Sequence, residues 1–147
     1  MAIADRLLKA EALRLTVYDD ATGKSIQPGS HVIGNPTIGI GTLICAPGGI
    51  TADEAQFLLN NRIEIAADAT EAIVGASFRA ADPTRFDVLT EMAFQMGGSG
   101  LAKFANMLQS VKESRWNDAA NDMLESTWAT QTPVRAQTLA KIMRSGR

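Results

Sequence analysis

Two carboxylates near the start of the chain have the residue types and spacing that cleavage of a glycosidic bond requires. Eight residues separate Glu11 from Asp20, and they predict a helix end, a strand and a turn. Neighbouring short elements can hold two carboxylates on opposite sides of one bond. One then protonates the leaving oxygen, and the other serves a water molecule or a developing positive charge. The chain has 16 acidic residues, so spacing alone leaves a second interpretation open: a solvated Glu at a helix end and an Asp that forms a turn.

The sequence lacks the residues and motifs that metal-dependent or nucleotide-dependent chemistry requires. A single His31 and a single Cys45 cannot supply a zinc site, and neither H-E-x-x-H nor C-x-x-C spacing occurs. The "GIG" at 39–41 is too short for a dinucleotide-binding fingerprint, and the sequence contains no G-x-x-x-x-G-K-[ST] phosphate loop. We therefore expect neither a metal nor a cofactor.

The elements that must position the two carboxylates are short. Residues 3–11 have the apolar spacing of an amphipathic helix, and from Leu13 the period changes to two, with Leu13, Leu15 and Val17 on one face of a half-buried strand. "DDATG" predicts a turn after this strand. "TIGIGTLI" then predicts the returning strand, whose glycines weaken packing and are typical of a bend or of close approach by another backbone or a ligand.

The remainder of the sequence is helical. Thr51 and Glu54 form an S/T-x-x-E capping box, and no helix breaker follows as far as Gly75. Helices are then predicted for "PTRFDVLTEMAFQM", closed by "GGSG", and for "LAKFANMLQSVK", "RWNDAANDMLES" and "TPVRAQTLAKIMRSG". We expect an α+β, predominantly helical protein with a small β-containing N-terminal lobe, a long connecting helix and an all-helical C-terminal lobe.

Composition narrows the possible partners. The 147 residues carry a formal net charge of −2, which gives no electrostatic attraction for nucleic acid or anionic membranes. No apolar run reaches the roughly 18 residues that span a bilayer. The charged residues within "MAIADRLLKAEALRL" are not those of a secretory signal peptide. We expect no nucleic-acid partner and no membrane insertion.

The segments "EALRLTVYDD" and "TIGIGT" together resemble the phage-type lysozymes, glycoside hydrolase family 24. In that family a Glu, eight residues and an Asp precede a Thr-Ile-Gly-x-Gly segment. Downstream, "FQMGGSGLAKF" and "RWNDAA…STWATQTPVRA" resemble its C-terminal lobe in order and spacing. The resemblance implies a single lysozyme domain over 1–147, with a β-containing lobe at 12–50, a connecting helix at 51–75, and a helical lobe of 1–11 and 80–147.

The resemblance also implies roles for three residues. Glu11 would be the general acid, with a pKa raised at a desolvated helix end. Asp20 would be the second carboxylate, favoured over the adjacent Asp19, and Thr37 would hold the attacking water through its hydroxyl. The family is regarded as inverting, which suits a water between the sugar and the second carboxylate.

Substrate-binding positions follow from the same resemblance. It implies that Arg135 approaches the catalytic Glu from the C-terminal lobe as a supporting residue. Trp116 and Trp128 resemble sugar-stacking platforms, but their helical positions favour core packing. The implied saccharide-binding positions are Leu43, Phe94, Gln95, Met107 and Asp122.

The implied function is a muramidase that hydrolyses the β-1,4 bond between N-acetylmuramic acid and N-acetylglucosamine in bacterial peptidoglycan. A lytic transglycosylase stays open, as does a catalytically dead or tail-associated relative that binds the wall. By resemblance we expect a monomer made in the host cytoplasm, released with the help of a holin, and acting on the cell wall.

Several features depart from the family pattern. Sixteen residues separate Asp20 from Thr37, more than in many relatives, so 21–36 contains an insertion. Thr42 stands where relatives often have His, and Met107 and Asp122 also differ from the family pattern. The net charge of −2 removes the attraction that basic relatives have for an anionic wall.

Overall fold

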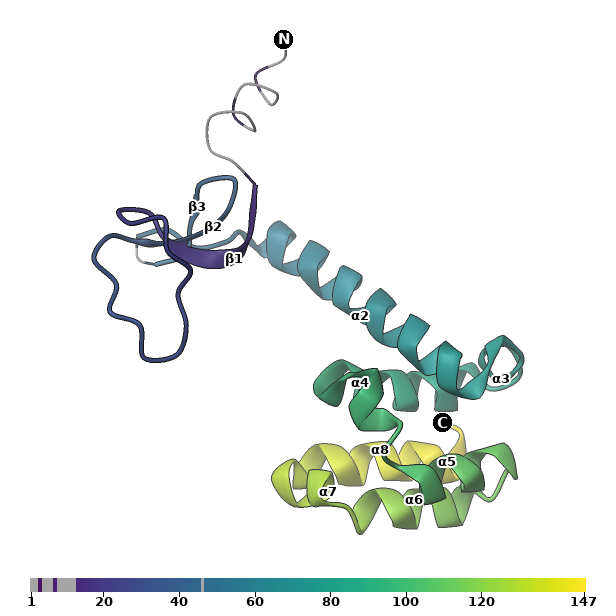
Figure 1. The fold of residues 1–147 in the computed structure, drawn as a ribbon. Coiled ribbons are helices and arrows are strands. Elements are labelled where there is room, and N and C mark those ends of the chain that lie inside the picture. The colour runs from purple at the N-terminus through teal and green to yellow at the C-terminus, as the bar shows by residue number, and fades with distance from the viewer. Residues whose placement is uncertain (1–2, 4–6, 8–12, 46) are drawn as a thin grey trace. The chain divides into compact units, whose positions relative to one another are not determined.

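The computed structural model describes residues 3, 7, 13–45 and 47–147 of the chain. The chain divides into two compact units, residues 1–56 and 57–147. From Arg14 onward the three strands precede the helices in the chain order (Figure 1), and the expected α+β, predominantly helical, lysozyme-like class is confirmed.

The first unit contains a small antiparallel sheet of order β1-β2-β3. Its strands are β1 (Arg14–Asp19), β2 (Pro36–Gly39) and β3 (Thr42–Leu43). Thr37 on β2 pairs with Tyr18 on one side and Leu43 on the other. The middle strand therefore joins the end of β1 to β3.

The prediction of one returning strand over "TIGIGTLI" is wrong in detail, because the segment folds into a hairpin of β2 and β3. Gly39 and Gly41 have φ of +70° and +71°, in the left-handed region that residues with a side chain rarely adopt. The alternation of Ile and Gly is thus explained by a tight turn.

Strand β1 forms as predicted, but its buried residues are not the expected ones. Leu13 is 58% exposed and Leu15 is 82% exposed, whereas Tyr18 and Asp19 are buried at the end where β1 pairs with β2. Burial in this strand therefore follows the pairing and not the period-two apolar pattern. The Arg14 guanidinium lies 4.8 Å from the centre of the Tyr18 ring.

Helix α2 (Ala52–Val74) begins and ends where its sequence predicts. Glu54 Oε2 accepts a hydrogen bond from the Thr51 backbone N–H at 2.7 Å, and Thr51 Oγ1 accepts one from the Glu54 N–H at 3.2 Å. The capping box is confirmed. At the other end, Gly75 has φ of +89° and separates α2 from the next helix.

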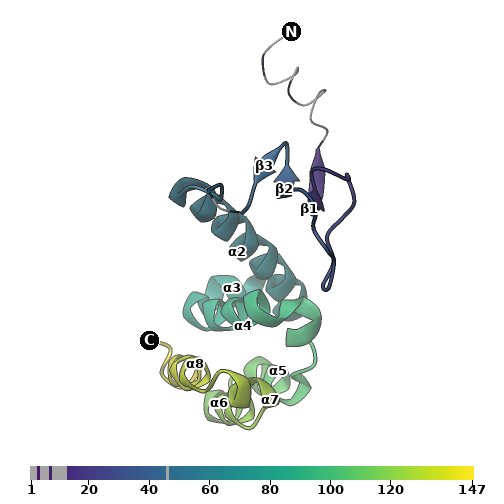
Figure 2. The same cartoon turned by 90° about the vertical axis from the view of Figure 1, so that its left-hand side faces the viewer.

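Six further helices follow among the described residues, and they pack on one another in pairs such as α5 with α6, α6 with α8 and α4 with α8 (Figure 2). They are α3 (Ala76–Ala81), α4 (Pro83–Leu101), α5 (Ala105–Lys112), α6 (Trp116–Leu124), α7 (Thr127–Gln131) and α8 (Pro133–Ser145). Pro133 occupies the first turn of α8, as predicted.

Two helix boundaries differ from the sequence prediction. The helix expected to close before "GGSG" continues to Leu101, with Gly97 as a break at φ 75° and ψ 163°. The next helix starts at Ala105, four residues later than expected, because α4 takes up Leu101 and a turn over residues 102–104 follows it. The short helices α3 and α7 are not predicted by the sequence patterns.

The helical unit has one buried hydrophobic cluster, and methionine is prominent in it. Long, unbranched methionine side chains fill irregular gaps between short helices. The largest fully buried apolar side chains are Leu89, Met92, Leu101, Met107, Val111, Met123 and Met143.

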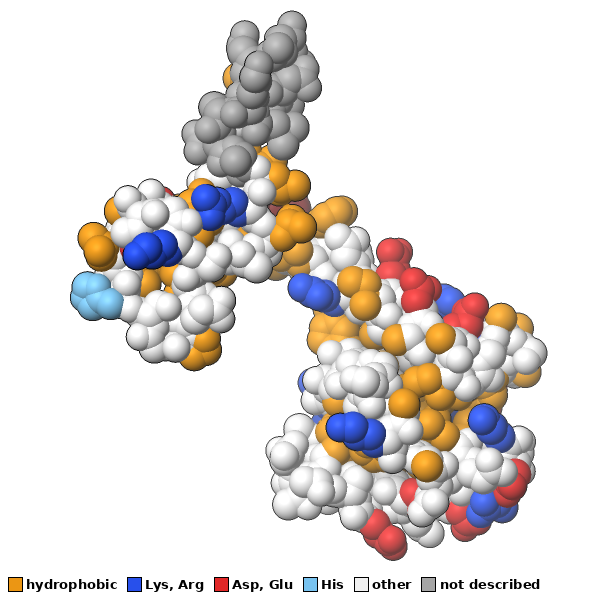
Figure 3. Space-filling model, viewed as in Figure 1, with side chains coloured by type: hydrophobic (Ala, Val, Ile, Leu, Met, Phe, Trp, Pro, Cys, Tyr) orange, Lys and Arg blue, Asp and Glu red, His pale blue; other side chains and the backbone are white. Residues whose placement is uncertain are grey.

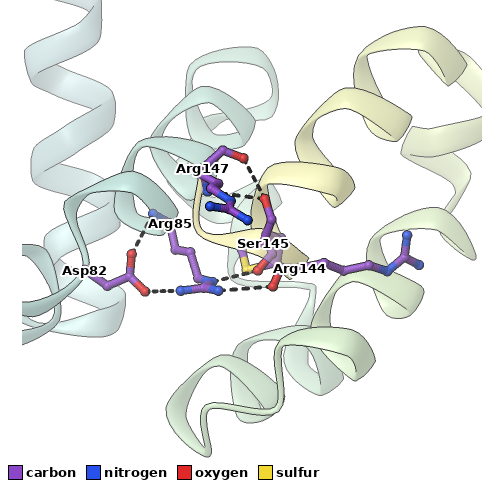
Figure 4. A network of polar contacts seen from close by, with 6 residues as sticks. Asp82, Arg85, Arg144, Ser145 and Arg147 are labelled. Atoms are coloured by element: carbon purple, nitrogen blue, oxygen red, sulfur yellow. Dashed lines mark hydrogen bonds and ion pairs between the residues drawn. The ribbon is translucent and has the colours of Figure 1, made fainter.

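A polar network fixes the start of α4 to the end of α8 (Figure 4). Arg85 Nε donates to the carbonyl of Met143 at 2.6 Å and Nη2 donates to that of Arg144 at 3.2 Å, while Nη1 pairs with Asp82. Asp82 also caps α4 by accepting from the Arg85 backbone N–H. The guanidinium lies 4.1 Å from the centre of the Trp116 ring, so one side chain joins three helices.

Five of the exposed large apolar side chains lie along α2 among charged ones, and Figure 3 shows hydrophobic and charged side chains side by side on this helix. They are Phe57, Leu58, Leu59, Ile63 and Ile65. No helix within the described part of the chain combines the length and the apolarity needed to cross a membrane.

Candidate active site

The turn after β1 places two consecutive carboxylates in different environments. The backbone N–H of Gly23 donates to the carbonyl of Asp19 at 2.8 Å, and Gly23 has φ of +68°. This tight turn, predicted from "DDATG", ends the strand at Asp19. It leaves Asp20 exposed at the first position beyond the strand.

The carboxylate of Asp20 is held at both oxygens by Asn35. Its Oδ1 accepts from the backbone N–H of Asn35 at 2.7 Å, and its Oδ2 accepts from Asn35 Nδ2 at 3.1 Å. These two hydrogen bonds lower the pKa of Asp20, against smaller opposing effects of desolvation and of the Asp19 charge. Asp20 is therefore ionised at neutral pH.

Asp19, the rival carboxylate, is only 4% exposed. It accepts hydrogen bonds from three backbone N–H groups: Ile33 at 2.8 Å, Gly34 at 2.9 Å and Ala21 at 3.0 Å. The bond from Ile33 is the largest cause of its lowered pKa. This carboxylate is occupied in joining the two ends of a loop.

Thr37 lies in the middle strand next to this turn and is 4% exposed. Its hydroxyl donates to the Asn35 carbonyl at 3.2 Å, and the same carbonyl accepts from the Asp20 backbone N–H at 3.1 Å. Because its hydrogen is used in this way, Thr37 Oγ1 retains lone pairs that can accept a hydrogen bond from a water. Leu43 pairs with Thr37 across β2 and β3.

The structure thus brings Asp20 and Thr37 together around Asn35, with Leu43 opposite Thr37 on β3. Sequence reasoning missed Asn35, although Asn immediately before Pro36 marks a turn. The local pattern could not show that its side chain reaches back 15 residues to Asp20. Glu11, the expected general acid, lies outside the described residues, and its role remains a prediction.

The predicted positions of the helical unit fall into separate places. Phe94 is 43% exposed and lines a hollow of about 440 Å³ together with Arg135. Arg135 Nε lies 3.5 Å from a carboxylate oxygen of Glu91. Gln95 accepts from the indole N–H of Trp128 at 2.9 Å, so its amide oxygen already has a partner.

Met107 and Asp122 line a second hollow, of about 300 Å³, beside α5 and α6. Met107 is only 1% exposed and belongs mainly to the core. Asp122 is half-buried, and its Oδ2 lies 3.5 Å from Ser110 Oγ. Of these two, Asp122 presents the more accessible polar group.

Both tryptophans pack in the core, as their helical positions predict. Trp128 is 8% exposed and contacts Phe104 edge to face. Trp116 is half-buried against the hydrophobic cluster. In the described ranges no group of three or more His, Cys, Asp or Glu side chains could hold a metal ion.

The comparison with protein families fits this arrangement of strand, turn and strand. The phage lysozyme family model matches residues 8–144. This chain belongs to the phage lysozyme family. The resemblance seen in the sequence is confirmed, and with it the family's enzyme class, the glycoside hydrolases.

Individual relatives of this family member are distant and longer. It is 32% identical to the pre-baseplate central spike protein Gp5 of Enterobacteria phage T4, over 99% of this chain and 28% of that protein. It is 30% identical to the probable T4-type lysozyme 2 of Dictyostelium discoideum, over 66% of this chain and 58% of that protein.

A third relative comes from another phage. The chain is 30% identical to the peptidoglycan hydrolase gp36 of Pseudomonas phage phiKMV, over 93% of this chain and 14% of that protein. The chain therefore spans between 14% and 58% of the length of these three curated relatives.

Proposed function

We propose that this chain is a peptidoglycan hydrolase, a muramidase that cleaves the β-1,4 bond between N-acetylmuramic acid and N-acetylglucosamine. The observation that carries the proposal is the exposed, ionised Asp20 carboxylate fixed beside Thr37 by Asn35. Family membership supports the same reaction class.

In the proposed reaction, Glu11 protonates the glycosidic oxygen as the bond to the sugar breaks. Asp20 accepts a proton from the attacking water and stabilises the positive charge that develops on the sugar ring. Thr37 Oγ1 accepts the other hydrogen of this water, since its own hydrogen is bonded to the Asn35 carbonyl. Products are a new muramic reducing end and a free hydroxyl on glucosamine.

A lytic transglycosylase is the less favoured alternative. That reaction needs one acid–base residue, and the sugar's own hydroxyl replaces water as the nucleophile. An ionised carboxylate with a neighbouring hydroxyl has no evident use in it. The proposed muramidase makes use of both Asp20 and Thr37.

The experiment compares wild type with Glu11→Gln and Asp20→Asn on purified peptidoglycan. Asp68→Asn, an exposed carboxylate on α2, is the matched control. We expect release of muropeptides by wild type and Asp68→Asn, and a loss of about 10²-fold or more in both site variants. Equal activity in Glu11→Gln would refute the role of Glu11.

A second candidate concerns where the enzyme is used. The phage T4 spike protein is similar to 99% of this chain. This similarity favours a lysozyme domain that is carried by a phage particle. The alternative is a lysozyme that accumulates in the host cytoplasm and is released by a holin. Mass spectrometry of purified phage particles distinguishes the two alternatives, because only a particle-borne enzyme is present in the particles at a fixed copy number.

A further inference from the structure

The two ends of the long loop that follows β1 are joined by a cluster of hydrogen bonds. Residues 19–21 meet residues 33–35, and the loop between them contains the insertion that departs from the family pattern. Asp19 accepts from Ile33 and Gly34, and Asp20 accepts twice from Asn35. The predicted insertion is therefore tied down next to the proposed catalytic carboxylate.

Gly34 lets the two ends approach closely. A Cβ built on Gly34 would lie 2.1 Å from Asp20 Oδ1 and 2.7 Å from the Ala21 Cβ, well inside van der Waals contact. A side chain at this position would displace Asp20 or separate the two ends. Glycine is needed here for space, since the position does not require a positive φ.

Asn35 makes four hydrogen bonds within the site. It donates to both oxygens of Asp20, one from the backbone and one from the side chain. Its carbonyl accepts from the Asp20 N–H and from the Thr37 hydroxyl. One residue thus determines the direction of the carboxylate and of the hydroxyl that are proposed to share a water.

We propose that Asn35 is a positioning residue, which orients the Asp20 carboxylate and Thr37 for attack by water, and that Asp19 and Gly34 hold Asn35 in place. The inference rests on the proposed hydrolytic function. It explains how catalysis tolerates the longer connection between Asp20 and Thr37. Because hydrogen bonds close the loop at its base, the number of residues in the loop does not change the positions of Asp20 and Thr37.

Charge near Asp20 also favours this role for Asn35. The negative charge of Asp19 disfavours ionisation of the Asp20 carboxyl. The Asn35 hydrogen bonds outweigh it and keep the pKa of Asp20 below its usual range. Without the Asn35 side chain, the pKa of Asp20 should rise.

The test measures kcat and KM on soluble, uncrosslinked glycan strands as a function of pH. We expect Asn35→Ala to lower kcat about tenfold with little change in KM, because a charge-assisted hydrogen bond that orients the carboxylate is lost. Activity requires ionised Asp20 and falls as pH drops through its pKa. The acid limb of the profile should therefore move to higher pH.

Asn35→Asp is the second variant, chosen because it keeps the size of the side chain. It replaces a donor by a like charge, so the acid limb should move further than in Asn35→Ala. His31→Ala, an exposed position in the same loop, is the control and should keep the wild-type profile. Unchanged kcat and an unchanged acid limb in both Asn35 variants would overturn the proposal.

An NMR titration of the Asp20 carboxyl carbon separates this inference from the proposed function. It needs no activity. We expect the Asp20 pKa to rise in the order wild type, Asn35→Ala, Asn35→Asp. If the wild type cleaved no glycan, the proposed function would fall. The same titration would still test whether Asn35 acts on the Asp20 carboxylate. An Asp20 pKa that neither substitution changes would overturn the role of Asn35.

Discussion

Asp19 and Asp20 are identical side chains with different surroundings. The first is buried and accepts hydrogen bonds from Ile33, Gly34 and Ala21, which makes it a structural anchor. The second is exposed and accepts hydrogen bonds from the backbone and the side chain of Asn35. Both pKa values are lowered, by backbone N–H groups in the first case and by Asn35 in the second. Access, and not acidity, therefore distinguishes the proposed catalytic carboxylate from its neighbour.

Thr37 allows a direct test of the proposed water site. Thr37→Val keeps the shape of the side chain and its β propensity but removes the hydroxyl, so we expect kcat to fall about 10²-fold, as for loss of a group that positions a proton transfer. Thr37→Ser keeps the hydroxyl and should retain most activity. Muropeptide release by the two variants is the measurement, and similar rates for both would contradict the role of the hydroxyl.

The sequence placed Asp20 and Thr37 correctly relative to local structure, because a turn and a strand are encoded by nearby residues. It did not predict Asn35 or the burial of Asp19, since both depend on contacts that span about 15 residues of loop. Contacts of that separation leave no periodic pattern to detect. The residue that orients the site was therefore found only in the structure.

The start of α2 shows what a local pattern can fix. Thr51→Ala removes the hydroxyl that accepts from the Glu54 N–H, and we expect the free energy of unfolding to fall by about 1 kcal/mol. Urea unfolding at pH 7 measures the change. Thr130→Ala, at an exposed helical position, is the control. Equal midpoints for Thr51→Ala and wild type would show that the Thr51 hydroxyl contributes nothing to stability.

The contribution of this cap should also depend on pH. The Thr51 backbone N–H, followed by its hydroxyl, lowers the pKa of Glu54 in the folded protein. A lowered folded pKa means that the stabilisation is complete above the unfolded value of about 4.3 and is lost as pH falls through the folded value. The difference between wild type and Thr51→Ala should therefore narrow in acid.

Helix starts were predicted better than helix ends or strand faces. The Thr51 cap of α2 and Pro133 in the first turn of α8 depend only on residues within one helical turn, so the sequence alone predicts both helix starts. Leu15 was expected on a buried face and is 82% exposed, because burial of a strand depends on which partner pairs with it. Gly97 interrupts α4 without ending it, which composition alone cannot distinguish from a stop.

The net charge of −2 belongs to the chain as a whole and predicts how lysis responds to salt. Attraction to an anionic wall would weaken as the Debye length shortens from about 30 Å at 0.01 M to about 8 Å at 0.15 M ionic strength. Because this chain has no net positive charge, we expect the rate of wall lysis to change little over that range. Turbidity loss of cell walls measures it, and a steep fall with added salt would contradict this expectation.

The reaction itself is tested most directly by digesting peptidoglycan in water enriched in oxygen-18 and analysing the new sugar ends by mass spectrometry after reduction. Hydrolysis by water held at Asp20 and Thr37 predicts one heavy oxygen at each new N-acetylmuramic reducing end, formed by wild type and not by Asp20→Asn. Unlabelled 1,6-anhydromuramic ends would contradict the account, because they form without water.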